Sequence, residues 1–153
     1  NISPFQYQEA GSEIMGGVYG TLDFWWALED HYPLAKDFVQ AFESEHNYKP
    51  RWTANIGYMQ TYLWALAVER AGTFYPPAVI KALESGHKVN STLGEVWYSD
   101  YDHQLVRPVP VVQGKTAAEK KGKEDNFKIV DVVAGDKVMV PKGTFGCELG
   151  PYT

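Results

Sequence analysis

The stretch SDYDHQ places Asp100, Asp102 and His103 within four residues, and carboxylates beside an imidazole could transfer protons. The same stretch is polar and lies between two predicted strands, so a structural turn is the competing interpretation. The histidines are scattered and form neither an HExxH motif nor another metal-ligand spacing: His31, His46, His87 and His103. These residues therefore predict neither a metal site nor a catalytic centre.

Cys147 is the only cysteine of the chain. No neighbour in the sequence suggests that its thiol is activated as a nucleophile. A single cysteine is most often a small apolar residue, whereas in a secreted protein it can indicate a partner elsewhere. The glycines form no GxGxxG or GxxxxGK[ST] motif, so no phosphate loop is predicted. We expect no enzyme activity and no cofactor.

The composition is that of a globular protein, with 153 residues, 44% of them hydrophobic and 22% charged. The formal net charge of −5 argues against a nucleic-acid partner, because phosphate binding needs a basic face. No apolar run approaches the roughly 20 residues that span a bilayer. The chain begins at Asn1 without a visible signal peptide, which predicts a processed form or a piece of a longer protein.

Aromatic residues make up 14% of the chain, with five Trp and ten Tyr. This content suits a site that holds a small organic ligand, although large core and surface aromatics are an equal alternative. The question is then which elements would place these side chains around one site.

Proline and glycine positions predict three helices. The first covers 33–47, with Pro33 in its first turn; the third runs from Pro76 and Pro77 to Glu84 and is closed by Gly86. The second extends from Thr53, as N-cap, to Gly72 and carries bulky groups on nearly every side. Such a helix must be buried on most of its circumference.

Strands are predicted before and after these helices. A short strand lies within 13–26 and runs into an aromatic loop. Residues 115–126 form a solvated loop, and the tail after 141 has no regular pattern. The later strands or extended segments cover 91–99, 108–114, 127–135 and 137–141. Since few central strands accompany such apolar helices, we expect an α/β fold whose remaining strands lie outside this chain.

Four stretches in this order resemble the carboxyl-terminal part of the periplasmic solute-binding proteins of ABC importers, in the branch that binds branched-chain amino acids, amides and aromatic acids. They are GVYGT followed by AKDFVQAFESEHNYKP, then ANIGYMQTYLWALAVERAG, PPAVIKALES with STLGEVWYSDYDHQ, and RPVPVVQ. The resemblance covers 16–113. It implies part of a type I fold, in which two flavodoxin-like lobes are joined by three hinge strands. It also implies a missing amino-terminal portion, which could hold a disulfide partner for Cys147.

The resemblance divides the chain into three parts. Residues 1–20 are the end of one lobe and a hinge crossing, 21–105 are helices and a strand of the other lobe, and 106–153 are the return crossing and an extension. Gly17 and Gly20 are the expected hinge residues, because a crossing segment can need unusual backbone angles. A bulge in a strand is the alternative for both glycines.

The resemblance places the ligand between the lobes. In the branched-chain amino acid binders, an aromatic residue five positions before the tyrosine that is Tyr58 here lines the pocket. This chain has Thr53 there, next to Trp52, which departs from the aliphatic amino acid pattern. The start of this helix could also face a carboxylate. The candidate ligand residues are Tyr19, Phe24, Trp25, Trp26, Trp52, Thr53 and Asn55; of Trp25 and Trp26 only one is expected to point inward, because neighbours in an extended chain face opposite ways.

The predicted function is therefore that of a periplasmic or extracellular receptor. It would capture an amino acid, an amide or an aromatic carboxylate and deliver it to the membrane subunits of an ABC importer. The alternative is a cytoplasmic small-ligand sensor of the same fold; a disulfide at Cys147 would favour the receptor, and a free thiol the sensor. A third possibility, an enzyme subunit with an aromatic substrate pocket, has no supporting residue set.

Overall fold

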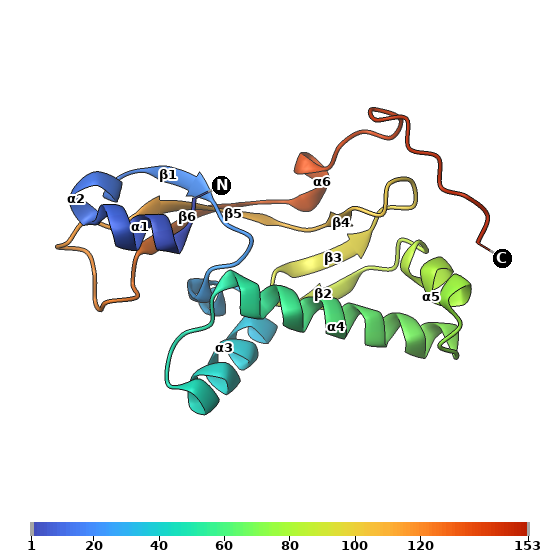
Figure 1. Cartoon of the computed structure of the whole chain (residues 1–153), viewed down its shortest axis with the longest axis horizontal. Coiled ribbons are helices and arrows are strands. Elements are labelled where there is room, and N and C mark those ends of the chain that lie inside the picture. The colour runs from blue at the N-terminus through green and yellow to red at the C-terminus, as the bar shows by residue number, and fades with distance from the viewer. Residues whose placement is uncertain (1, 153) are drawn as a thin grey trace.

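The computed structural model describes residues 2–152, and their strands form two separate antiparallel sheets (Figure 1). The first sheet has the order β1-β5-β6, with β1 at Tyr19–Thr21, β5 at Val109–Gly114 and β6 at Phe127–Val133. The second sheet has the order β2-β3-β4, with β2 at Val89–Ser91, β3 at Gly94–Tyr98 and β4 at Leu105–Val106.

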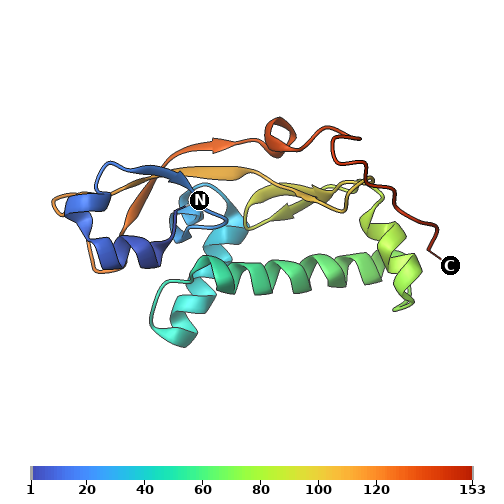
Figure 2. The same ribbon diagram turned by 45° about the horizontal axis from the view of Figure 1, so that its top comes forward.

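The helices divide between these sheets, as Figure 1 and Figure 2 both show. Beside the first sheet lie α1 (Pro4–Ala10) and α2 (Ser12–Met15). The 3₁₀ helix η1 (Trp26–Asp30) leads to α3 (Pro33–His46), α4 (Trp52–Ala71) and α5 (Pro76–Leu83), which lie on the side of the second sheet. The short α6 (Gly135–Val138) precedes an extended carboxyl-terminal tail.

The ends of the predicted helices are mostly confirmed. Pro33 and Pro76 each stand at the first helical position, where proline lacks only an N–H that would be unpaired anyway. Gly72 ends α4 in the left-handed conformation, with φ 65°. The predicted N-cap is wrong, because α4 begins at Trp52 and the extended residue before it is Arg51, which makes no side-chain cap.

Three local features differ from the sequence prediction. The first residues, for which the sequence predicted no helix, form α1, which is capped by a Ser3 and Gln6 capping box. Of the strand predicted at 91–99, Gly94–Tyr98 forms β3, whereas Ser91 ends β2 and the chain turns between them, with φ +88° at Gly94. The segment 137–141, predicted as a strand, contributes Lys137 and Val138 to α6 and is extended only from Met139 onward.

The described residues bury their apolar side chains in two clusters. The first lies between the second sheet and helices α3 and α4 and contains Phe24, Leu28, Ala35, Val39, Met59, Leu63, Leu93 and Val96. The second lies between the first sheet and α1 and contains Ile2, Tyr7, Leu22, Trp25, Val112 and Phe127. Neighbouring residues Phe24 and Trp25 enter different clusters because the chain is extended here, with φ −134° and ψ 135° at Trp25.

Within this chain α4 is buried on one side only, and its burial on most of its circumference by polypeptide outside this chain stays a prediction. Its buried side chains are Asn55, Met59, Leu63 and Ala67. On other sides of the helix Tyr58 is 39% exposed and Trp64 is 49% exposed. The charged residues of α4 are confined to its last turn, so a long uncharged surface of this helix remains open.

The chain passes between the two sheets at neighbouring places. Thr21 pairs with Val111, and Val109 pairs with Val133, so the connections after β1, before β5 and after β6 leave the first sheet at the same end. Gly135, which follows β6, packs so closely on the connection before β5 that a Cβ atom would lie 2.8 Å from the backbone N and C of Arg107. A side chain at Gly135 would force these connections apart.

The loop at 115–126 is held by ion pairs and gives a prediction for its acid sensitivity. The hydrogen bond from Lys128, followed by those from the Thr116 amide and hydroxyl, lowers the pKa of Glu119 from 4.5 to about 2. A lowered folded-state pKa means that this contact stabilises the loop above pH 4.5 and is lost as the pH falls toward 2. Lys128→Gln should raise the pKa of Glu119, measured by NMR titration of its carboxyl group.

A matched change, Lys81→Gln on α5, should leave the pKa of Glu119 where it is. If Lys128→Gln also leaves it unchanged, Lys128 does not hold this carboxylate.

Candidate functional site

A cavity of about 250 Å³ opens where α4 begins. Trp52 lines it from α4, while Ile2, Ser3 and Gln6 line it from the start of the chain and α1. Leu22 and Asp23, which leave β1, complete the lining. The walls of this cavity thus come from elements that belong to different sheets.

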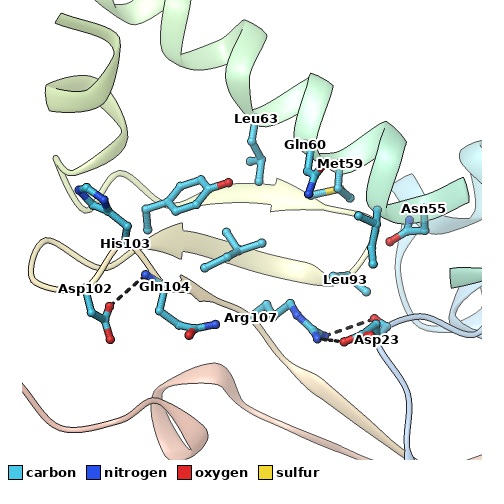
Figure 3. Close-up of a pocket in the computed structure, with 13 residues that line it drawn as sticks. Asp23, Asn55, Met59, Gln60, Leu63, Leu93, Asp102, His103, Gln104 and Arg107 are labelled. Atoms are coloured by element: carbon cyan, nitrogen blue, oxygen red, sulfur yellow. Dashed lines mark hydrogen bonds and ion pairs between the residues drawn. The ribbon is translucent and has the colours of Figure 1, made fainter. Parts of the chain in front are cut away.

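A second cavity of about 390 Å³ continues along α4 (Figure 3). Met59, Gln60 and Leu63 face it from α4, opposite Leu93 and Gln104 of the second sheet and its turn. Asp23 lines both cavities, so they adjoin at this residue; we call the two adjoining cavities the groove. The groove combines an apolar floor with side-chain amides, which suits a small organic molecule.

Asp23 forms an ion pair with Arg107 at the centre of this groove (Figure 3). The Arg107 guanidinium bonds the Asp23 carboxylate and also donates to the Asp23 carbonyl oxygen at 3.3 Å. The two residues lie on the first and second connections between the sheets. The pair therefore ties these connections together and compensates the charge of Asp23 in the groove.

Asn55 is buried and donates from Nδ2 to the Thr92 hydroxyl at 2.7 Å. This bond joins α4 to the β2–β3 turn and keeps two buried polar groups paired. Burial raises the pKa of the Tyr98 hydroxyl, which lines the same groove, so that this group stays neutral and able to donate.

Residues 3–123 match the family model described as "Periplasmic binding protein". The chain belongs to this family. No sequence among the curated proteins matches it. As expected for this family, the chain has part of the type I α/β fold.

Solved structures agree on the fold of this periplasmic binding protein chain. An amino acid ABC transporter substrate-binding protein from Pseudomonas fluorescens Pf-5 aligns with a TM-score of 0.79 and 22% identity over 96% of this chain and 38% of its own. A branched-chain amino acid ABC transporter periplasmic ligand-binding protein from Burkholderia xenovorans LB400 aligns with a TM-score of 0.74 and 20% identity, over 92% of this chain and 36% of its own. An ABC transporter solute-binding protein from Rhodopseudomonas palustris BisB5, in complex with 3,4-dihydroxybenzoic acid, aligns with a TM-score of 0.68 and 18% identity, over 84% of this chain and 34% of its own. The binding protein chain thus spans little more than a third of these proteins.

The structure brings only some of the predicted ligand residues to the groove. Trp52 lines the first cavity and Asn55 the second. Thr53, the second residue of α4, is exposed, and Tyr19, the first residue of β1, is 65% exposed. Ligand contacts of Thr53 and Tyr19 stay predictions.

The other aromatic candidates pack inside the binding protein chain. Phe24 is fully buried in the first cluster, and Trp25 is buried in the second, where its Nε1 donates to the Phe127 carbonyl at 3.0 Å. Trp26 is half-buried beneath Lys49, whose Nζ lies 5.3 Å from the ring centroid. The structure gives these residues packing contacts; any ligand contact stays a prediction.

Gly17 precedes β1, at the end of the first sheet away from the connections, whereas Gly20 is the middle residue of β1 and directly precedes Thr21 at the connection end. Gly17 has φ +82° and donates its N–H to the Gly114 carbonyl, so it needs the left-handed conformation. Gly20 lies within β1 at negative φ and leaves room for Ile2, since a Cβ atom there would be 2.6 Å from the Ile2 Cβ. Their hinge role stays a prediction.

The stretch SDYDHQ is the polar turn that the competing interpretation predicted. The Ser99 hydroxyl and the Gln104 N–H bond the Asp102 carboxylate and lower its pKa. His103 has φ 58°, and its Nε2 lies 2.5 Å from Oε1 of Glu84, the residue that follows α5. Each of these groups thus has a structural contact.

Cys147 is exposed and unpaired within this chain, and its disulfide with a partner outside the chain stays a prediction. Residues 2–152 contain no group of three or more His, Cys, Asp or Glu side chains suited to a metal ion. In the same range, no helix is long and apolar enough to cross a membrane.

Several groove residues were not among the sequence candidates, above all Asp23 and Arg107. Both are charged residues in otherwise apolar stretches, TLDFW and LVRPV, and this was the available signal. Ser3 and Gln6 were missed because α1 itself was missed.

Proposed function

We propose that this chain is one part of a two-lobed periplasmic receptor that captures a small solute for an ABC importer. The observation that supports this most is the cavity at Trp52, whose walls belong to different sheets joined by neighbouring connections. A solute bound there touches both sides and favours the arrangement in which they are close. The solved structures named above are solute-binding proteins of ABC transporters, so a cytoplasmic sensor is not favoured.

In this proposal the lobes follow the two sheets. Residues 1–20, with α1 and α2, end one lobe; 21–105, with α3, α4 and α5, belong to the other; and 106–153 contain the return crossing and the extension. The position of Asp23 and Arg107 on the connections favours a hinge at this pair in place of Gly17 and Gly20.

The open surface of α4 supports the presence of further polypeptide in the receptor. Tyr58 and Trp64 are large, exposed and part of an uncharged surface. An exposed apolar surface of this kind is typical of an interface. We propose that the remaining sheet of the lobe covers it.

The proposed ligand is an amino acid, an amide or an aromatic carboxylate. Trp52 offers a flat apolar face, and the groove adds the amide groups of Gln6, Gln60 and Gln104. The start of the 20-residue helix α4 lies at the same cavity and favours a carboxylate group there. The Rhodopseudomonas palustris relative, in complex with 3,4-dihydroxybenzoic acid, makes the aromatic carboxylate a reasonable first choice.

Calorimetry on the two-lobed receptor that contains this chain tests the proposal, with leucine, acetamide and 3,4-dihydroxybenzoate as ligands. We expect one of these classes to bind the receptor tightly and none to bind the 153-residue chain tightly, because the chain supplies only part of the cleft. Mass spectrometry of small molecules that co-purify with the receptor extends the panel. Tight binding by the isolated chain, or a receptor that neither binds nor co-purifies with a solute, would contradict the proposal.

A further inference from the structure

Arg51 contacts two elements that lie beside the first sheet, namely α1 and the loop at 115–126. It is the residue directly before α4, so its backbone is continuous with the wall that carries Trp52. Its guanidinium carbon lies 4.6 Å from the ring centroid of Phe5 in α1. Its Nη2 lies 3.8 Å from Oε1 of Glu124, in the loop at 115–126. Both partners belong to the part of the chain that surrounds the first sheet.

The surroundings of Arg51 are too tight for a solute. The space that it shares with Pro4, Gln8 and Trp25 amounts to about 10 Å³, roughly the room needed by one water molecule. Arg51 therefore contacts protein groups here, while the neighbouring Trp52 faces the larger cavity.

We infer that Arg51 is a positioning residue that holds the two walls of the solute cavity together without touching the solute. This inference rests on the proposed function. The cation–π contact with Phe5 and the ion pair with Glu124 exist only while the walls are close, so they favour the arrangement that binds solute. Losing both should lower the share of molecules in this arrangement and weaken binding accordingly.

The test compares Arg51→Gln with Arg51→Lys in the two-lobed receptor. Arg51→Gln removes the charge, whereas Arg51→Lys keeps a cation that can reach either partner. We expect Arg51→Gln to raise the Kd of the panel ligand that binds the wild type by about fivefold, the effect of losing one partly exposed ion pair and one cation–π contact. Small-angle scattering of the ligand-free Arg51→Gln protein should show a larger radius of gyration than that of the wild type. Arg51→Lys should largely restore both the Kd and the radius of gyration of the wild type.

The exchanged pair, Arg51→Glu with Glu124→Arg, provides a second measurement. The double variant should bind the solute more tightly than either single variant, because the ion pair is re-formed with its direction reversed. Melting temperatures show whether each variant is folded; if Arg51→Gln is not, Glu124→Gln replaces it, since the Glu124 side chain is partly exposed.

An unchanged radius of gyration in Arg51→Gln would overturn the inference, whatever the solute. A wild-type receptor that binds no solute would instead contradict the proposed function, and an expanded ligand-free Arg51→Gln protein would still support the role of Arg51. The two failures are therefore distinguishable.

Discussion

Phe24→Ala is expected to lower the free energy of unfolding by about 3–5 kcal/mol, the usual cost of removing a buried aromatic ring. The Phe24 side chain is 0% exposed and contacts Phe38 edge-to-face, with ring centroids 5.8 Å apart. It lies in the cluster that joins α3 and α4 to the second sheet. Urea unfolding followed by circular dichroism measures the change.

The matched control is Tyr19→Ala, in which the lost side chain is 65% exposed. Its effect on the free energy of unfolding should stay within about 0.5 kcal/mol. The molecules of Phe24→Ala that remain folded should bind solute as the wild type does. If Phe24→Ala instead weakens binding and leaves stability unchanged, Phe24 is a ligand residue after all, as the sequence first suggested.

The helix ends could be predicted because their signals are local. Proline fixes φ at a helical value and glycine tolerates φ > 0, so Pro33, Pro76 and Gly72 mark the ends of helices whatever surrounds them. The capping box of α1 is an equally local signal, but the helix that follows it has only seven residues, too few for a clear helical repeat of apolar positions. The order of strands and helices then followed from these boundaries.

Which aromatic residues reach the cavity could not be predicted in the same way. The extended backbone explains why Phe24 and Trp25 point in opposite directions, but both directions lead into a core. The second core forms from Ile2, Tyr7 and Phe127, which are distant in sequence from Trp25. Burial at such a position depends on the topology and not on the pattern around it.

The contact between Asp23 and Arg107 could not be predicted from the sequence either, because it also depends on the topology. The two are 84 positions apart and meet because β1 and β5 pair in register, from Tyr19 with Gln113 to Thr21 with Val111. A charged residue in an apolar stretch indicates that a partner exists, since an unpaired charge is costly there. It does not indicate which residue is the partner.

Trp52→Ala should act mainly on solute binding, whereas Phe24→Ala acts mainly on the free energy of unfolding. Trp52 is half-buried at the first turn of α4 and faces the cavity that Ile2 and Ser3 line from the other side. If a solute ring or chain packs on the indole, its loss should weaken binding by roughly 1–3 kcal/mol, or about 5- to 150-fold in Kd.

Calorimetry of the two-lobed receptor measures the Trp52→Ala change, and Thr53→Ala is the neighbouring control. Thr53 is exposed on the next position of the helix, so its loss separates an effect of the indole from a general disturbance of the α4 start. Trp52→Phe should retain much of the affinity, because a smaller ring still offers an apolar face. Equal affinities for Trp52→Ala and wild type would place Trp52 among the packing residues. The ligand would then have to be held by the groove around Gln60 and Arg107, whose amide and guanidinium groups recognise polar atoms without an aromatic surface.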